Sequence, residues 1–419
     1  MREGAIRRLG ISALSLVAVV AAACGGSAST TQSASGGPPI RLGMIDTLSG
    51  PTAGVGTDGQ KGASVAVDEI NKAGGILGGR KFEIVPEDEQ LSPTASVKAV
   101  RDLNSQGVNL LFGFTSSSDA LAAVPVARQL GMSIVASHAS ATPLRTTQFV
   151  PNFAAVANSD YLSANASPDF LRKEFPQIHT WNVFSYDYLT GHEGWNLFKS
   201  KMKDRDSQFT VGKEIFIPQT ATDLTPYITS MLSGLASDSG STQGVYIFLF
   251  GAGEVNLFKQ GAPYGLGQRF KVILTSGGGY EALANTLKTD TPSSWVGYDY
   301  SYKGFNNAMN RQFIKDFDAA NGGTPPDTWA EQSYSAVYMY KAAIEKAKSD
   351  DPAKVIATFG GLSYDTPMGT IKLDQKTHQA FVPLTFTHFE ADPTSAQGWK
   401  ESDAVVIWPP ASAAVPPQS

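Results

Sequence analysis

Residues 49–88, SGPTAGVGTDGQKGASVAVDEINKAGGILGGRKFEIVPEDE, constrain the fold more than any other part of the chain. A strand predicted at residues 41–48 leads into a Gly-rich loop, and a helix then starts near Gly59. Apolar side chains recur along that helix with the spacing i, i+3, i+4, i+7, at Ala63, Ala66, Val67 and Ile70. Gly74 and Gly75 end the helix, and residues 81–85 predict a second strand. This order indicates an open α/β sheet, in which the loops at the strand ends bind small ligands.

The same alternation continues to about residue 136. Ser92 and Pro93 have the pattern of an N-cap followed by proline at the first helical position. The continuously apolar residues 108–112 are typical of a strand that is buried on both faces. Another helix is predicted at residues 116–130 and a fourth strand at residues 133–136. Strands that alternate with helices over short connections predict a parallel, doubly wound sheet.

A second α/β pattern begins near residue 180. Strands are predicted at residues 180–185, 211–217, 245–250 and 271–275, with helices between them, the last at residues 280–287. Two further helices, at residues 308–320 and 329–348, precede short strands near residues 369–373, 382–388 and 404–408. The folded part has about 370 residues, more than one hydrophobic core usually holds. We therefore predict an α/β protein with two doubly wound parallel-sheet lobes and a ligand cleft between them.

The N-terminus predicts export. Three arginines, at positions 2, 7 and 8, precede the almost wholly apolar residues 11–23. This is the layout of a secretory signal peptide, and the apolar run is too short to span a bilayer. Cys24, the only cysteine of the chain, follows immediately and resembles the acylated cysteine of a bacterial lipobox. The alternatives are a buried free cysteine and an ordinary signal peptide that is cut nearby.

These features predict a signal peptide at residues 1–23 and a lipid on Cys24, followed by a flexible tether up to residue 39. The tether is rich in Ser, Thr, Ala and Gly and has no apolar period. The Pro/Ala-rich residues 409–419 predict a disordered tail. The protein is thus expected outside the bacterial cytoplasmic membrane, either held at its outer face by the lipid or periplasmic.

Composition and motifs exclude several function classes. The chain has 33 Lys and Arg residues against 38 Asp and Glu residues, a net charge of −5, and no basic patch of the kind that binds nucleic acid. Its five histidines do not have metal-ligand spacing, and the GxSxG motif of serine hydrolases does not occur. We predict neither a cofactor, nor a metal site, nor enzymatic activity.

Residues 49–88 resemble the leucine/isoleucine/valine-type solute-binding proteins of bacterial ABC importers, which have the type I periplasmic binding fold. The likeness continues through VNLLFG at residues 108–113 and AAVPVA at residues 122–127, and more thinly through TDLTP at residues 222–226. It covers about residues 40–406. The resemblance implies a monomer that traps a small molecule between two lobes and delivers it to an ABC permease.

The family's lobes are joined by three crossovers. The resemblance therefore implies that residues 40–158 and about 301–362 form lobe 1. Residues 159–300 and about 363–408 would then form lobe 2.

The resemblance places a carboxylate site after the third strand. Ser116 and Ser117 lie at a helix start, where free backbone N–H groups and the positive helix end favour an anion. Ser117 occupies the position at which the family holds the ligand carboxylate, and the alternative is a simple N-cap. Val55 occupies a position where related proteins place an aromatic residue over the ligand, and the alternative there is local packing.

The loop after the fourth strand is the second expected contact. The family uses a backbone group and a Thr hydroxyl here, and Ala139 and Ala141 take those positions on either side of Ser140. A shift of one residue would use Thr142 instead. His138 is interpreted as a solvated loop side chain.

In lobe 2 the resemblance implies an aromatic lid. Tyr188 and Thr190 lie near the position where the family closes its lid, and Phe250 follows a predicted strand at another matching position. The alternative for each of them is a place in the hydrophobic core.

The largest departure from the family lies in the loop at residues 276–280, which contains Gly278 and Tyr280. Amino-acid binders of the family hold the ligand ammonium with a carboxylate in this loop, and Gly278 takes that position. A buried ammonium without a countercharge is unfavourable. Glu281, Glu254 or Asp187 are alternative countercharges. We infer a ligand without an α-ammonium, such as an amide, a urea-like solute or a carboxylate.

The sequence therefore predicts capture of a branched-chain amino acid, an amide or a small carboxylate by lobe closure. Two alternatives remain open. One is a ligand sensor on the same fold that signals to a membrane partner, and the other is a secreted enzyme.

Overall fold

The computed structural model describes residues 36–276 and 280–408, apart from the side chain of Ala282. The predicted signal peptide, Cys24, the tether up to residue 35, Gly278 and the tail at residues 409–419 lie outside the described residues and remain predictions. Residues 36–39, the described end of the tether, are exposed and precede the first strand.

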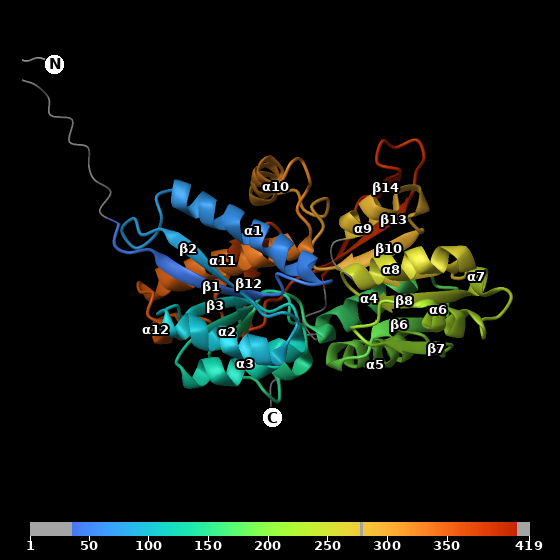
Figure 1. The fold of residues 1–419 in the computed structure, drawn as a ribbon, viewed down its shortest axis with the longest axis horizontal. Helices are drawn as coiled ribbons and strands as arrows, with labels where there is room; N and C mark the ends of the chain where they lie inside the picture. The colour runs from blue at the N-terminus through green and yellow to red at the C-terminus, as the bar shows by residue number, and fades with distance from the viewer. Residues whose placement is uncertain (1–35, 277–279, 409–419) are drawn as a thin grey trace, which may run out of the picture. The chain divides into compact units, whose positions relative to one another are not determined.

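The first sheet has five parallel strands in the order β2-β1-β3-β4-β5. Figure 1 shows β2, β1 and β3 side by side in this order. They are β1 (Ile40–Asp46), β2 (Phe82–Asp88), β3 (Leu110–Gly113), β4 (Ser133–Ala136) and β5 (Phe153–Ala155). Ile45 pairs with Gly113, and Gly113 pairs with Ala136. The carboxyl ends of the central strands therefore meet at one edge, where the loops after β3 and β4 begin.

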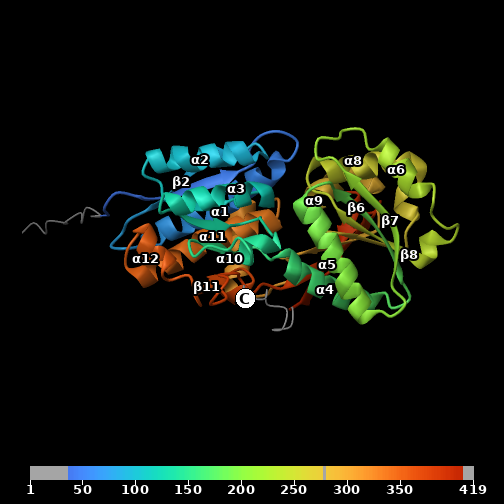
Figure 2. The same cartoon turned by 90° about the horizontal axis from the view of Figure 1, so that it is seen from below.

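Helices cover both faces of this sheet. α1 (Ala53–Lys72), α10 (Ala308–Ala320) and α11 (Thr328–Ala347) share one apolar cluster with β1. On the other face, α2 (Pro93–Ser105) and α3 (Ser117–Gln129) form a second cluster, and Figure 2 shows them on the side away from α11. α1 and α11 touch through their backbones, because a Cβ atom added to Gly62 would lie 1.9 Å from the carbonyl oxygen of Ala330.

The second sheet has eight strands in the order β14-β13-β10-β9-β8-β6-β7, with β15 also paired to β13. Its parallel strands are β6 (Thr180–Tyr186), β7 (Thr210–Ile217), β8 (Gln243–Phe248), β9 (Val272–Thr275) and β10 (Ser294–Tyr298). The antiparallel strands at one edge are β13 (Leu384–Ala391), β14 (Trp399–Glu401) and β15 (Val405–Ile407). The predicted α/β class is confirmed, and the second sheet adds an antiparallel edge to it.

Helices also cover both faces of the second sheet (Figure 2). α4 (Asp160–Glu174) and α5 (Leu189–Arg205) pack on one face. α6 (Thr225–Leu232), α8 (Ala252–Gly261) and α9 (Tyr280–Leu287) pack on the other. The short helices are α7 (Ser239–Thr242), α12 (Pro352–Ile356), and 3-10 turns at Thr142–Arg145, Ala262–Tyr264, Leu266–Gln268 and Lys288–Asp290.

The chain passes three times between the two sheets and their helices. The crossovers lie between β5 and α4, between β10 and α10, and between Val382 and Leu384, which belong to different apolar clusters. The last crossover comes later than expected. We expected residues from about 363 onward to join the second lobe, but the hairpin of β11 (Ser363–Thr366) and β12 (Gly369–Lys372) packs on α11. The reason is that Tyr364, Met368 and Ile371 bury their side chains in the cluster of the first sheet.

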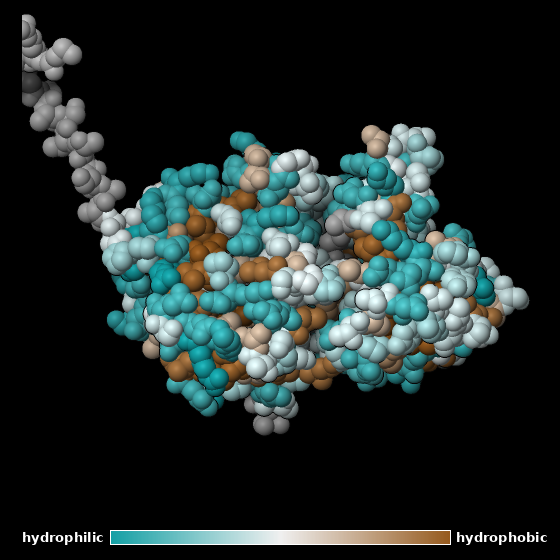
Figure 3. All heavy atoms as spheres, viewed as in Figure 1, coloured by the Kyte–Doolittle hydropathy of each residue, from teal (hydrophilic) through white to brown (hydrophobic). Residues whose placement is uncertain are grey.

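The visible surface is mostly hydrophilic with small apolar spots, as Figure 3 shows. Among the described residues, the exposed large apolar side chains are Leu130, Leu189, Val211, Tyr264 and Trp408. They lie far apart in the sequence, and single apolar side chains of this kind are usual on protein surfaces. None of the helices between residues 36 and 408 that are described combines the length and the apolar composition of a membrane span.

Candidate functional site

Two adjoining cavities lie at the carboxyl ends of the parallel strands. The first, here called the hinge cavity, is lined by crossover residues such as Asn158 and Asp299 and encloses about 530 Å³, including its open mouth. The second, here called the loop cavity, is lined by Val55 and Phe250 and encloses about 480 Å³ on the same measure. The two share five lining residues: His138, Ser140, Phe248, Ser276 and Tyr298. Together they form the candidate site.

Five of the residues predicted from the sequence line the loop cavity. They are Val55, Ser117, Ser140, Tyr188 and Phe250. These residues come from the loops or helix starts after β1, β3, β4, β6 and β8. The fold therefore brings the predicted contacts of both lobes together, and their role in binding stays a prediction.

Ser117 holds the loop after β4 in place. Its hydroxyl oxygen accepts the backbone N–H groups of Ser140 and Ala141, each at 3.1 Å. The hydroxyl hydrogen is still available to a ligand, because both of these bonds use only the oxygen as acceptor. Ser116 is the N-cap of α3 and accepts the N–H of Ser118 at 3.3 Å. Ser117 thus lines the cavity at the positive end of a helix, whereas Ser116 has the capping role that was the alternative.

The remaining predicted residues do not line either cavity. Ala139 and Ala141 are buried, and their carbonyl groups accept hydrogen bonds from Arg145 at 2.7 and 3.1 Å. The N–H of Thr142 donates to the carboxylate of Glu193 at 3.2 Å. The sequence predicted that these three residues contact the ligand. In the structure they belong to the loop that supports the cavity and do not line it.

Thr190 and Tyr280 also lie elsewhere. Thr190 is buried in the first turn of α5. Tyr280 is buried and lines a different cavity, next to Phe389. Gly278 lies outside the described residues.

Arg145 is a residue that sequence reasoning missed. Its guanidinium group is fully buried and donates to the carbonyl groups of Ala139 and Ala141 and, at 2.6 Å, to the side chain of Gln379. Burial lowers its pKa to about 10, while the charges of Asp160 and Glu193 act in the opposite direction. Arg145 stays protonated at neutral pH and fixes the loop that carries Ser140. Nothing in the local sequence indicates that this arginine is buried.

His138 is buried in the wall of both cavities, so its interpretation as a solvated side chain is wrong. Its Nδ1 lies 2.7 Å from the Oε1 atom of Gln332, and its Nε2 lies 3.3 Å from the Oδ2 atom of Asp46. Burial is the largest single effect on His138 and lowers its pKa, but the Asp46 carboxylate, the hydrogen bond to Gln332 and the charge of Asp327 together raise it more, so the net shift is upward. The imidazole is thereby held between β1 and α11.

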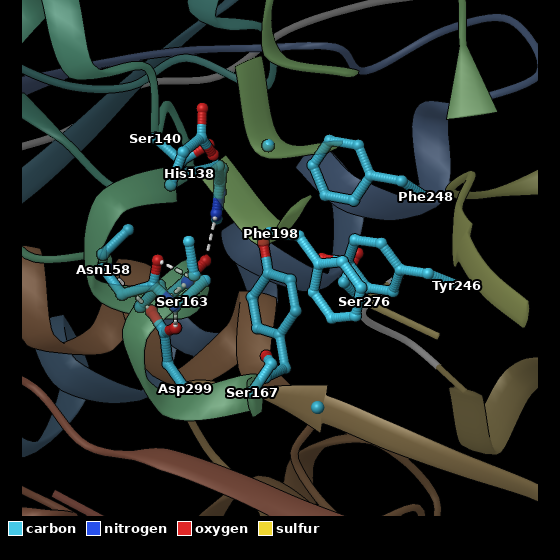
Figure 4. Close-up of a pocket in the computed structure, with 17 residues that line it drawn as sticks. His138, Ser140, Asn158, Ser163, Ser167, Phe198, Tyr246, Phe248, Ser276 and Asp299 are labelled. Carbon is cyan, nitrogen blue, oxygen red and sulfur yellow. Dashed lines mark hydrogen bonds between the residues drawn. The ribbon is translucent and has the colours of Figure 1, made fainter. Parts of the chain in front are cut away.

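Asp299 connects two crossovers beside the hinge cavity. Its carboxylate accepts the backbone N–H of Asn158 at 2.8 Å, the side-chain amide of Asn158, and the side-chain amide of Gln332 at 2.8 Å. Figure 4 shows Asp299 and Asn158 with Ser163 on one side of the cavity. Burial raises the pKa of Asp299 to about 6 despite these hydrogen bonds. The carboxylate is fully used by the protein and therefore has a structural role.

Asp160 is the acidic group that faces the hinge cavity with spare hydrogen-bonding capacity. The residue is only 5% exposed, and its Oδ2 atom has no hydrogen-bond partner within the described residues. Burial, together with the nearby Glu193, raises the pKa of Asp160 to about 8. At neutral pH the group is largely protonated and can donate to an acceptor, whereas a cationic partner would favour its charged form.

Aromatic side chains form the opposite wall. Figure 4 shows Phe198, Tyr246 and Phe248 across the cavity from His138, Ser140 and Asn158. The rings of Tyr246 and Phe248 are stacked with centroids 6.2 Å apart, and Tyr188 stacks on Phe248 at 6.3 Å. The site thus offers hydroxyl and carboxyl groups on one side and a flat apolar surface on the other, a combination that suits a small ligand with one polar end. In the parts of the chain that the structure covers, no group of three or more His, Cys, Asp or Glu side chains is arranged to hold a metal ion.

Comparisons with known proteins agree with this geometry. The sequence model of a family described as periplasmic binding protein matches residues 39–394. A Leu/Ile/Val-binding protein of Rhizobium johnstonii is 32% identical over 328 residues, which cover 76% of this chain and 82% of that protein. A leucine-, isoleucine-, valine-, threonine- and alanine-binding protein of Pseudomonas aeruginosa is 23% identical over 370 residues, covering 85% of this chain and 92% of that protein.

Among solved structures, a solute-binding protein of an ABC transporter from R. palustris in complex with benzoate superimposes with a TM-score of 0.74. It is 21% identical and the match covers 88% of this chain and 97% of that one. At this identity the likeness establishes the fold alone.

Proposed function

This chain belongs to the periplasmic binding protein family, and we propose that it captures a small carboxylate with an apolar body outside the cytoplasmic membrane and delivers it to an ABC permease. The observation that carries the proposal is the position of Ser117. This residue lines the loop cavity at the N-terminus of α3, and the aromatic residues Tyr188 and Phe250 line the same cavity. A carboxylate at Ser117 would receive the hydroxyl hydrogen and the field of the helix.

Asp160 extends the proposal to the other end of the ligand. The sequence led us to expect a ligand without an α-ammonium, because Gly278 takes the position of the family's carboxylate. Asp160 lines the adjoining hinge cavity with an unpartnered oxygen atom among the described residues. It can accept one N–H or O–H donor of the ligand. We therefore propose a ligand with a carboxylate, an apolar or aromatic body and one hydrogen-bond donor, a class that includes branched-chain amino acids, hydroxybenzoates and carboxylic amides.

Closure around the ligand would use the crossovers as hinges. The candidate site draws Ser117 and Ser140 from the first sheet and Tyr188 and Phe250 from the second. A ligand that contacts both sets stabilises the arrangement in which they face each other. This coupling is the reason to expect that binding changes the relative position of the lobes.

A panel of solutes tests the ligand class. The full mature chain is screened by thermal shift with leucine, valine, benzoate, 4-hydroxybenzoate, acetamide and urea, and each hit is measured by calorimetry. A ligand present at 100 times its Kd stabilises the folded state by about 2.7 kcal/mol. We expect shifts with carboxylates that carry a donor and none with urea. Stabilisation by acetamide and urea alone would contradict the role of Ser117.

Delivery to a permease has its own test. Membranes that contain the candidate permease should accumulate the identified solute only when this protein is added. Deletion of the protein should abolish uptake of the same solute by whole cells. Unchanged uptake, together with a transcriptional response to the solute, would favour the sensor alternative.

A further inference from the structure

A third cavity lies behind Tyr298, the residue that also lines the hinge and loop cavities. This rear cavity is lined by Tyr280, Glu281, Tyr300, Thr328 and Glu401, among others, and encloses about 330 Å³, including its mouth. Among the described residues, Tyr298 is the one lining residue that it shares with the proposed solute site. None of the interactions proposed for the solute uses this space.

The lining residues come from both halves of the fold. Glu281 lies in the first turn of α9 and Glu401 is the last residue of β14, both with the second sheet. Thr328 is the first residue of α11, which packs on the first sheet. Tyr300 lies in the crossover between β10 and α10. An occupant of the rear cavity would thus contact both lobes and the segment that joins them.

Three residues that line the rear cavity, Tyr280, Thr328 and Glu401, each have a buried oxygen atom without a hydrogen-bond partner among the described residues. The side chain of Glu401 is 2% exposed, and its Oε2 atom accepts from Lys303 at 2.9 Å and from Tyr302 at 3.1 Å. Its Oε1 atom is buried without a hydrogen-bond partner, and so is the Oγ1 atom of Thr328, as far as the described residues extend. Buried polar atoms almost always have a partner, so three unpartnered atoms on one cavity indicate that the cavity takes a polar or charged occupant.

The electrostatics of the cavity favour a positive occupant. Burial and the nearby carboxylates of Glu401 and Asp327 raise the pKa of Glu281 to about 8, and Lys303 only partly opposes this effect. At neutral pH Glu281 is therefore largely protonated without a positive partner, and Lys303 already pairs with Glu401. A cation would favour the charged form of Glu281, which would then supply the one negative charge that balances it. The rings of Tyr280 and Tyr300 also line the space, and aromatic faces attract cations.

From these contacts we propose that the rear cavity binds a small monovalent cation, held by the free oxygen of Glu401, the hydroxyl of Thr328 and the carboxylate of Glu281. Carboxylate and hydroxyl oxygens are the donors that hard cations prefer. A divalent ion is disfavoured, because it requires more carboxylate charge than the cavity leaves unpaired. The bound cation would join the two lobes behind the solute site.

Thermal unfolding in different chlorides tests the proposal without any solute. The melting temperature of the full mature chain is measured in potassium, sodium, ammonium and choline chloride at equal ionic strength. We expect at least one small cation to raise Tm over choline by about 2 °C or more, with saturation as its concentration increases. Equal Tm values in all four chlorides would overturn the proposal.

Variants assign the effect to the cavity. Glu401→Gln should abolish the difference in Tm between the chlorides. Thr328→Val, which keeps the charge of the cavity, should reduce this difference. Glu390→Gln is the matched control, because Glu390 forms an exposed ion pair with Lys400 on the neighbouring strand. The difference in Tm between the chlorides should be the same in Glu390→Gln as in the wild type. A cation effect that survives in Glu401→Gln would place the ion elsewhere and reject this site.

Crystals provide a second measurement if Glu401→Gln does not fold. Wild-type crystals soaked in thallium(I) acetate should show an anomalous peak between Glu401 and Thr328. A data set with no peak in the rear cavity would reject the proposal. Because neither experiment contains a solute, the outcome is independent of the proposed transport function.

Discussion

The carboxylate of Asp299 accepts hydrogen bonds from both the backbone and the side chain of Asn158, and thereby joins the first two crossovers of the fold directly. Gln332 of α11 donates to the same carboxylate, and its own oxygen lies 2.7 Å from the Nδ1 atom of His138. A continuous set of hydrogen bonds therefore runs from the crossovers to the wall of the candidate site.

Replacing Asp299 by alanine should destabilise the protein strongly. The change removes the acceptor of three donors, two of them from Asn158 and one from Gln332. Leaving a buried donor without a partner costs about 1–3 kcal/mol, and we expect a total loss of at least about 3 kcal/mol in the free energy of unfolding. Urea denaturation measures it. Asp290→Ala, on an exposed turn, is the control and should change stability little. Equal stability of both variants would show that the crossovers do not depend on this carboxylate.

Because of the buried carboxyl group of Asp160, the free energy of unfolding should decrease as pH rises. Its folded pKa of about 8 lies above the model-peptide value of 3.8, so the folded state binds more protons than the unfolded state between these values. The contribution is therefore fully present below about pH 4 and is lost as pH rises through 8. Asp160→Asn should remove this dependence and raise stability at pH 8 by on the order of 1–3 kcal/mol.

The measurement is the midpoint of urea unfolding between pH 5 and 8.5, for the wild type and Asp160→Asn. Glu174→Gln, at the exposed end of the same helix, is the control and should keep the slope of the wild type. If the wild type and Asp160→Asn have the same slope, the buried carboxyl is not the source of the pH dependence.

Ser117→Ala should weaken carboxylate ligands. The variant loses the hydroxyl hydrogen offered to the ligand and the oxygen that accepts the N–H groups of Ser140 and Ala141. We expect the binding free energy of a carboxylate to fall by about 1–3 kcal/mol. Calorimetry with the best carboxylate of the solute panel checks this. Ser118→Ala, one residue further along α3, should bind normally, and an unchanged Kd for Ser117→Ala would remove Ser117 from the site.

Cys24 is predicted to carry a lipid. Cells that express the full chain and are fed radioactive palmitate should label the wild type, because the only cysteine stands directly after the predicted signal peptide. Cys24→Ala should lose the label and appear in the soluble extracytoplasmic fraction. Label that persists in this variant would contradict acylation at Cys24.

The sequence predicts the layers of the fold well, because alternating apolar periods report directly on local structure. The bounds of β4, α9 and α10 are those predicted. α1 begins at Ala53, six residues earlier than the predicted start at Gly59. Because of Gly56 and Gly59, the segment before the predicted helix was interpreted as a Gly-rich loop. A Cβ atom on Gly56 would lie 2.3 Å from the carbonyl oxygen of Thr47, so this glycine allows the start of α1 to lie close to the loop after β1.

The sequence analysis did not predict elements that lack a clear period of apolar residues. α4 contains Pro168 and several Ser and Asn residues, which are weak helix formers, and its helical state depends on burying Phe170 and Leu171. β10 has only five residues and includes Gly297. Whether these segments form a helix and a strand depends on tertiary packing, which a local sequence pattern does not show.

The candidate site shows the same limit. Ser117, Ser140 and Val55 were placed at the ligand mainly by the resemblance to the family; they line the loop cavity, and their role in binding stays a prediction. Arg145 and Asp160 were missed because the burial of a polar side chain is a tertiary property. A single sequence shows a charge at these positions but not that its surroundings exclude water.

Arg145 gives the most direct test of how the loop after β4 is supported. Its guanidinium group is fully buried and donates to Ala139, Ala141 and Gln379. Arg145→Met keeps much of the apolar stem but removes a donor from three acceptors, of which the Ala141 carbonyl still accepts the N–H of Leu144 at 3.2 Å. We expect a loss of about 2–4 kcal/mol in stability. Because the loop also carries Ser140, the affinity for a carboxylate should fall as well.

Arg128→Met is the matched control. Arg128 is exposed on α3, and its substitution by methionine changes the net charge by the same amount. It should alter neither stability nor binding. Urea denaturation and calorimetry on both variants separate the two effects, because the affinity of Arg145→Met is measured at a temperature where the variant is fully folded. A variant that is destabilised but binds with wild-type affinity would show that the loop keeps its shape without Arg145. In that case the hydrogen bonds that Ser117 accepts from the N–H groups of Ser140 and Ala141 would suffice to hold the cavity-lining residues in position.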